Sequence, residues 1–267
     1  MDSIIKKTLL YKSGVEYADF SINHVVGCSH GCMFPCYAFY MSKRFGRIRD
    51  YNDWIKPKLV KNSLELLDKE IPKYKDKIKF VHLCFMTDPF MYGYKEVKEM
   101  TLKIIEKLNE NGIRCTVLTK GIYPKNLTDK EKYGYQNEYG ITLVSLDNEF
   151  KHVFEPFSAP YEDRIKSLKL LHNKGLRTWI SMEPYPTPNL VEQDLLELLN
   201  KVSFVDRIIF GKLNYNTISS SFKENSTFYD GCAKTVIQFC KSNRIDYHIK
   251  FGTQREYNKR TQTLFVR

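Results

Sequence analysis

Short apolar stretches that end in polar residues alternate with amphipathic stretches along most of this 267-residue chain. Strands are expected at 20–26, 78–85, 114–118, 140–146, 176–182, 205–210 and 247–251. Helical spacing of apolar residues is found at 63–74, 97–108, 161–174, 191–201 and 229–241. Strands separated by single helices predict βαβ units and a parallel sheet. We therefore expect an α/β fold.

The polar residues at the strand ends predict one active-site mouth. In parallel α/β barrels the functional side chains gather at the carboxyl ends of the strands. That rule selects a cysteine-rich loop after the first strand and a series of residues after the later ones. These are Thr87, Asp88, Lys120, Ser145, Glu183 and the loop 211–216.

Three of the seven cysteines, Cys28, Cys32 and Cys36, lie within nine residues in the spacing C-x3-C-x3-C. Three thiolates from one loop can hold three irons of a [4Fe–4S] cube, which leaves the fourth iron without a protein ligand. The alternatives are buried inert thiols, disulfides, or a structural zinc ion with His30 as fourth ligand. Zinc sites usually take their cysteines as pairs from two separated loops, which favours the cluster.

Composition adds weaker constraints. The formal net charge of +11 and the pI of about 9.1 are compatible with a phosphate-bearing partner. The odd number of cysteines indicates a reducing compartment, so we expect a cytoplasmic protein. The chain has no run of 18 apolar residues, and no membrane association is expected.

One segment after the cysteine loop interleaves cations with aromatic residues. This pattern suits contact with phosphates together with stacking on bases. A solvated helix end that packs its aromatic residues inward is the alternative. The candidate substrate-binding residues are Lys43, Arg44, Arg47, Arg49 and Trp54.

The order of motifs resembles the radical S-adenosylmethionine (SAM) superfamily and, within it, the spore photoproduct lyase-like branch. The resemblance covers about residues 18–190, by the order of matching motifs, and it is less clear over 205–267. The family spacing is usually C-x3-C-x2-C, so Pro35 is an extra residue here. The matching motifs are the cysteine loop with Cys36-Tyr37-Ala38, Thr87-Asp88-Pro89-Phe90, Leu118-Thr119-Lys120, Ser145, and Phe154-Glu155-Pro156 followed by Arg164.

The resemblance implies a partial (βα)6 TIM-type barrel over residues 18–204. A short N-terminal segment, 1–17, would precede it, and a strand–helix–strand over 205–267 would complete the barrel edge. It also implies a [4Fe–4S] cluster on the three cysteines, SAM on its open iron, reductive cleavage of SAM, and an electron donor such as flavodoxin or ferredoxin.

The resemblance also implies roles for single residues. Phe34 and Tyr37 would flank the adenine of SAM, and Thr87 and Asp88 would contact its amino group. Lys120 and Ser145 would contact the carboxylate or the ribose, and a cation and a hydroxyl suit such acceptors. Glu183 completes the candidate cofactor-binding residues.

Spore photoproduct lyase uses a cysteine at the end of its second strand as a hydrogen-atom donor. The matching position here is Met86 or a close neighbour, and Cys84 lies two residues earlier on the same strand face. Cys84 is therefore either a hydrogen donor or a buried core residue. For the substrate, nucleic acid is the first expectation and a peptide or protein the second. A non-catalytic iron–sulfur or zinc scaffold is the alternative from another class, and the oligomeric state stays open.

Overall fold

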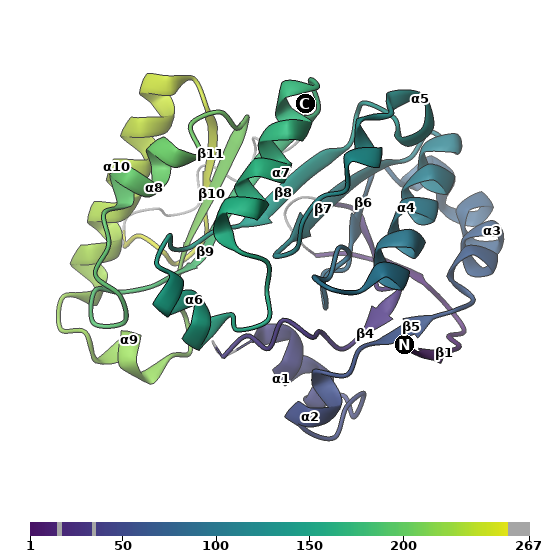
Figure 1. Ribbon diagram of the computed structural model, residues 1–267, viewed down its shortest axis with the longest axis horizontal. Helices are drawn as coiled ribbons and strands as arrows, with labels where there is room; N and C mark the ends of the chain where they lie inside the picture. Colours follow the sequence, from purple (N-terminus) through teal and green to yellow (C-terminus); the bar gives the residue numbers. More distant parts are fainter. Residues whose placement is uncertain (15–17, 34–35, 256–267) are drawn as a thin grey trace.

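Two sheets organise the computed structural model, which describes residues 1–14, 18–33 and 36–255 (Figure 1). The larger sheet has eight strands in the order β11-β10-β9-β8-β7-β6-β3-β2, and the smaller has the order β1-β5-β4. The strands are β1 (Asp2–Ile4), β2 (Leu10–Lys12), β3 (Phe20–Ile22), β4 (Val25–Val26), β5 (Lys58–Val60), β6 (Phe80–Leu83), β7 (Arg114–Thr119), β8 (Glu138–Thr142), β9 (Arg177–Tyr185), β10 (Arg207–Lys212) and β11 (Asp246–Ile249).

The larger sheet is parallel from β3 through β11, and only β2 runs antiparallel to its neighbour β3. From β3 onward its strands lie in the order of the chain, as in a barrel. Among the described residues its edge strands β2 and β11 do not pair with each other, so the barrel is open. The expected α/β fold with a mostly parallel sheet is confirmed.

Helices cover the outer face of the larger sheet, with α3, α4, α7, α8 and α10 following one another around it (Figure 1). In the described residues no helix has the length and apolar character needed to cross a membrane. The helices are α1 (Tyr37–Arg44), α2 (Tyr51–Trp54), α3 (Ser63–Tyr74), α4 (Lys95–Glu110), α5 (Lys130–Tyr133), α6 (Asn148–Phe154), α7 (Tyr161–Asn173), α8 (Leu195–Lys201), α9 (Thr217–Ser221) and α10 (Asn225–Asn243), with 3-10 turns η1 (Lys75–Lys77) and η2 (Lys125–Thr128).

The core lies between the sheet and these helices. Apolar strand residues such as Ile22, Val81 and Ile141 are fully buried against helix residues such as Ile104 and Leu168. Burying one such side chain stabilises the fold by about 1.5–3 kcal/mol. Because many side chains of this layer are buried together, the strands and the residues at their ends are held in fixed positions.

The N-terminal part differs from the sequence prediction. The strand expected at 20–26 is divided: β3 belongs to the larger sheet and β4 to the smaller one. The chain changes sheet at Asn23 and His24, where the His24 carbonyl accepts the N–H of Val60 at 2.9 Å. The segment 1–17 contains two strands, β1 and β2, and β5 was not predicted. Strands of two or three residues are too short to show an alternating pattern.

Candidate functional site

The cysteine loop is held in place by α2 and by the segment after α6. The Cys28 N–H donates to the carbonyl of Trp54 at 2.9 Å, and the Tyr51 hydroxyl donates to the carbonyl of Gly31 at 2.8 Å. Gly31 has a φ of +66°, and a Cβ at this position would lie 2.7 Å from a ring carbon of Phe157. Glycine is therefore favoured here, and these contacts fix the path of the loop at Cys28 and Gly31.

The three loop cysteines open into one cavity of ≈ 480 Å³ at the carboxyl ends of the strands, called the site cavity below. All three are free, partly buried thiols. Ser145 is absent from the described lining, and Phe34 lies outside the described residues. The predicted site residues that the cavity brings together with the cysteines are Tyr37, Trp54, Cys84, Thr87, Asp88, Lys120 and Glu183.

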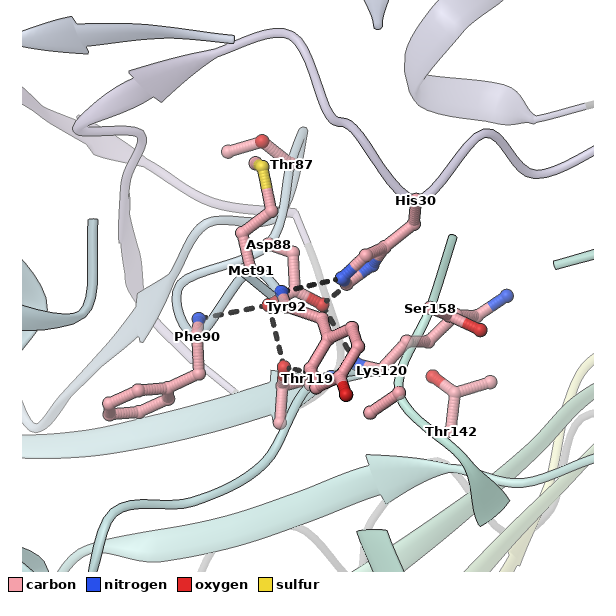
Figure 2. Close-up of polar contacts among 12 residues, drawn as sticks. His30, Thr87, Asp88, Phe90, Met91, Tyr92, Thr119, Lys120, Thr142 and Ser158 are labelled. Carbon is pink, nitrogen blue, oxygen red and sulfur yellow. Dashed lines mark hydrogen bonds and ion pairs between the residues drawn. The ribbon is translucent and has the colours of Figure 1, made fainter. Parts of the chain in front are cut away.

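Asp88 is the centre of a hydrogen-bond network beside this cavity (Figure 2). Its Oδ1 accepts the Phe90 N–H at 2.9 Å and the Thr119 hydroxyl at 2.6 Å. Its Oδ2 accepts the Lys120 backbone N–H at 2.8 Å and lies 3.5 Å from the His30 Nδ1. Because these groups already use both oxygens, the geometry favours a positioning role over the predicted direct contact with the SAM amino group.

His30 is buried and held as a neutral ring. Its Nε2 accepts the Tyr92 N–H at 3.0 Å, so its proton lies on the Nδ1 that faces Asp88. Burial lowers the pKa of His30 to about 4, against the opposing effect of Asp88. Both ring nitrogens are engaged, so the alternative of zinc with His30 as fourth ligand is wrong. In the described residues, no group of His, Cys, Asp or Glu is arranged to hold a single metal ion.

A buried ion-pair network stands behind the loop. The Lys120 Nζ lies 2.7 Å from the Glu155 Oε1 and 3.6 Å from the Cys32 sulfur. The Arg164 guanidinium lies 2.8 Å from the Glu155 Oε2 and donates to the Thr142 carbonyl at 3.0 Å. Burial alone would raise the pKa of Glu155, but the two cations lower it to about 2. The network thus places an ammonium group beside a cysteine sulfur.

Burial makes a charged thiolate in the cysteine loop unfavourable unless a metal ion stabilises it. Burial raises the pKa of Cys32 to about 11, although Lys120 opposes this effect, and burial raises the pKa of Cys28 as well. A bound iron ion stabilises a thiolate directly, because coordination deprotonates the thiol. Three partly buried thiols with a neighbouring cation therefore fit a [4Fe–4S] cube, in which each thiolate has its own iron.

Cys84 follows β6 directly and lines the site cavity. Its φ is +63°, a conformation that is uncommon for a residue with a side chain. Its sulfur lies 3.3 Å from the His24 Nδ1, and the His24 Nε2 lies 2.8 Å from the Thr101 hydroxyl oxygen. That hydroxyl donates to backbone carbonyls such as that of Val97, so Nε2 donates and Nδ1 accepts from the thiol.

This thiol–imidazole pair stays neutral in both members. Burial lowers the pKa of His24 to about 3 and raises the pKa of Cys84. Sequence reasoning missed His24 because it lies 60 residues from Cys84 and belongs to no local motif. Its only signal is a histidine at the point where the first predicted strand meets the cysteine loop.

Of the other predicted cofactor residues, Thr87 and Glu183 line the site cavity and Ser145 does not. The Thr87 hydroxyl donates to a backbone carbonyl of the cysteine loop, that of Gly27. Glu183 lines the site cavity with its carboxylate 3.5 Å from the Lys250 Nζ. Ser145 is fully buried and lies beyond the end of β8, where its hydroxyl accepts a backbone N–H at 3.0 Å. The predicted contacts of all three with SAM stay predictions.

The predicted substrate residues do not form one surface. Lys43 and Arg44 lie exposed in the last turn of α1, and the Arg49 side chain is 89 % exposed. Trp54 lines the site cavity but is only 2 % exposed, which favours the alternative of inward packing, and stacking on a base there stays a prediction. Arg47 alone among these residues lines a second cavity.

Two curated proteins resemble the chain. One is an uncharacterised protein of Acidianus two-tailed virus, 26 % identical over 199 residues, which are 71 % of this chain and 64 % of that protein. The other is an uncharacterised protein of Methanocaldococcus jannaschii, 27 % identical over 179 residues, which are 67 % of this chain and 64 % of that protein. The match thus spans less than two thirds of the length of each relative.

Solved structures resemble the fold. Spore photoproduct lyase complexed with dinucleoside spore photoproduct has a TM-score of 0.65 at 14 % identity, covering 92 % of this chain and 80 % of that one. A variant of that enzyme with AdoMet and the same ligand has a TM-score of 0.64 at 13 % identity, with the same coverage. Streptococcus suis SuiB bound to its precursor peptide SuiA has a TM-score of 0.50 at 15 % identity, covering 68 % and 41 %.

A family model matches the part of the chain that contains most of the site residues. The model of the radical SAM superfamily matches residues 22–202, which is more than half of the chain and includes the cysteine loop and the strands β4 to β9. The chain belongs to the radical SAM superfamily.

Proposed function

We propose that this chain cleaves SAM reductively and abstracts a hydrogen atom from a nucleic-acid substrate. The observation that carries the proposal is the site cavity itself. It brings Cys28, Cys32 and Cys36 together with Lys120 and Cys84. A cavity of ≈ 480 Å³ lies in the range of small-molecule and cofactor sites.

In this proposal, Cys28, Cys32 and Cys36 hold a [4Fe–4S] cluster, and SAM lies in the site cavity. When bound, the cluster supplies the electron that cleaves SAM to a 5′-deoxyadenosyl radical. Lys120 offsets negative charge beside Cys32, since its ammonium group lies 3.6 Å from the sulfur. Tyr37, the first residue of α1, offers a ring to the adenine. An electron donor such as flavodoxin or ferredoxin would supply the electron.

Cys84 is the proposed donor of a hydrogen atom to a substrate carbon radical. This role requires the thiol rather than the thiolate, because the transfer breaks an S–H bond. Burial raises the pKa of Cys84 and so keeps the thiol protonated. His24 is a positioning residue in this proposal, because it touches Cys84 and does not line the site cavity.

For the substrate, nucleic acid is favoured over a peptide. The chain carries a net charge of +11, and cations line a cavity next to the site. A neighbour in structure is complexed with a dinucleoside, although another is bound to a precursor peptide. These likenesses concern the fold alone, so the substrate choice depends on the charges and cavities of this chain.

Anaerobic reconstitution with iron and sulfide, followed by SAM and dithionite, tests the chemistry. We expect formation of 5′-deoxyadenosine by the wild-type protein and none by Cys32→Ala. Cys84→Ala should still form 5′-deoxyadenosine, because Cys84 holds no iron in this proposal. Failure of the iron-loaded wild type to cleave SAM would contradict the proposed function.

A further inference from the structure

A larger cavity of ≈ 700 Å³, called the N-terminal cavity below, lies between the N-terminal segment and α1. Its lining includes the three cations Lys6, Lys7 and Arg47 and, among the described residues, no carboxylate. Four aromatic side chains also line it: Tyr11, Tyr37, Phe45 and Phe85. Cations together with aromatic rings suit a ligand that carries both phosphate and a planar base.

Hydrogen bonds to uncharged groups fix Lys6 in this cavity. The Lys6 Nζ donates to the carbonyl of Asn23 at 2.9 Å, and the Lys6 backbone exchanges hydrogen bonds of 3.1 and 2.8 Å with the Asn62 side chain. In the part of the chain that the structure describes, neither Lys6 nor Arg47 forms an ion pair. Arg49, by contrast, lies 3.9 Å from Asp53, which also pairs with Lys58.

Lys6 and Arg47 also act on each other. Burial lowers the pKa of Lys6, and the nearby Arg47 lowers it further. Two like charges that meet at a cavity without a carboxylate repel each other until an anion arrives. The guanidinium carbon of Arg47 lies 5.5 Å from the centre of the Phe45 ring, so the cation and an exposed aromatic face are already paired.

The N-terminal cavity adjoins the site cavity. Tyr37 and Phe85 line both, and their ring centroids lie 6.0 Å apart. Phe85 follows Cys84 directly in the chain. Tyr37 is 56 % exposed and Phe45 is 61 % exposed, so both rings can accept a stacked base. A ligand held by Arg47 and Phe45 would therefore extend toward Cys84.

We propose that the N-terminal cavity binds one nucleotide of a single-stranded nucleic acid, with Lys6 and Arg47 on its phosphate and Phe45 against its base. The adjoining nucleotide then lies at Tyr37 and the site cavity. A single strand is required because a base inside a duplex has no free face for Phe45. The inference rests on the proposed function only in naming its substrate; binding itself needs neither SAM nor turnover.

Fluorescence anisotropy with a labelled single-stranded thymidine oligonucleotide and the reconstituted full chain tests this assignment. Arg47→Glu and Lys6→Gln should each weaken binding about ten-fold or more. Each should also reduce the slope of log affinity against log salt by about 0.7. Phe45→Ala should weaken binding about five- to a hundred-fold with the slope unchanged.

The matched controls are Arg244→Glu and Lys12→Gln, which make the same charge changes at exposed residues outside the cavity lining. They should change affinity less than about two-fold if binding is local rather than general.

The assignment is overturned if the controls weaken binding as much as the cavity variants, or if the oligonucleotide shows no salt-sensitive binding. A duplex that binds as tightly as the single strand also overturns it. Cavity-specific binding by a protein that forms no 5′-deoxyadenosine supports the assignment and contradicts the proposed function, so the two failures are distinguishable.

Discussion

The two cavities differ in how their charges are balanced, although Tyr37 and Phe85 belong to both. Beside the site cavity, Lys120 and Arg164 are paired with the fully buried Glu155. In the N-terminal cavity, the lining cations have no carboxylate among the described residues. Cations held in ion pairs with a buried carboxylate give a rigid frame for a cofactor, whereas cations without a carboxylate partner gain stability from an anionic ligand. The site cavity is therefore organised before a ligand binds, whereas the charge of the N-terminal cavity is balanced only when an anion binds.

The largest expected effect separates the loop thiols from the other cysteines. Cys28→Ala, Cys32→Ala or Cys36→Ala should each abolish or cripple the brown [4Fe–4S] absorbance and the bound iron, because each thiolate holds its own iron. Cys240→Ala, a buried cysteine of α10, should keep full iron content. Iron analysis after anaerobic reconstitution decides this, and stoichiometric zinc without iron would contradict the cluster.

The next largest effect is expected from disrupting the buried ion-pair network of Glu155. Glu155→Gln leaves the buried Arg164 without its anion, and we expect a loss of about 3–5 kcal/mol in the free energy of unfolding. The matched control is Glu162→Gln, which removes the partner of Lys201 in an exposed pair of 2.9 Å and should cost about 0–1 kcal/mol. Urea denaturation of both variants measures the difference. Equal costs would show that the buried network does not stabilise the frame.

The histidines beside the sheet make the frame sensitive to acid. Burial lowers the pKa values of His24 and His82 to about 3, below the ordinary value of 6.5. The unfolded chain therefore binds more protons below pH 6.5, and stability is complete above that pH and lost as the pH falls toward 3. These two groups contribute about 2.7 kcal/mol per pH unit, and His30, whose pKa is lowered to about 4, adds about 1.4 kcal/mol per pH unit.

Denaturation midpoints measured from pH 8 to pH 5 check this slope. His82→Gln should reduce it by about 1.4 kcal/mol per pH unit. His152→Gln, at an exposed position of α6, should leave it unchanged. A slope equal in wild type and His82→Gln would show that His82 is not kept neutral by folding.

Sequence reasoning predicted the larger sheet and most of the site cavity for one reason. Strand cores such as 114–118 are apolar and their ends are polar, and parallel strands bring those ends to one edge. Lys120 follows β7 as this rule expects, whereas Glu183 lines the cavity from inside β9, which extends to Tyr185 rather than ending at residue 182. Ser145 was misplaced relative to its strand, since β8 ends at Thr142, three residues before it. Periodicity sets element ends poorly, because the last residues of a strand need not be apolar.

The contacts that sequence reasoning missed join residues far apart in the chain. His24 contacts Cys84, which lies 60 residues later in the chain. The oxygens of Asp88 interact with Thr119 of β7 and with His30 of the cysteine loop. Trp54 was a candidate for stacking because cations and aromatic residues alternate in its segment, with inward packing as the alternative, and the structure buries it. The N-terminal cavity is formed by a segment whose strands are too short to predict, so Lys6 carried no signal.

The smallest effect concerns the Lys120 ammonium, which lies beside both Glu155 and the Cys32 sulfur at the site cavity. It has three N–H donors, of which one faces Glu155 and one faces the Cys32 sulfur, and Lys120 lines the site cavity. Lys120→Met keeps the length of the side chain but removes this charge. We expect SAM affinity to fall about ten- to a hundred-fold, the loss of one charge-assisted contact of about 1.5–3 kcal/mol.

The matched control for SAM binding is Lys166→Met, at an exposed position of α7 far from the cavity lining. Equilibrium binding of SAM to the iron-loaded proteins is the measurement, with iron content as a check that the cluster is retained. Because Lys120 does not line the N-terminal cavity, oligonucleotide affinity should be the same in Lys120→Met and wild type. Loss of both affinities together would mean that the two cavities are one functional unit; loss of neither would remove Lys120 from the SAM site.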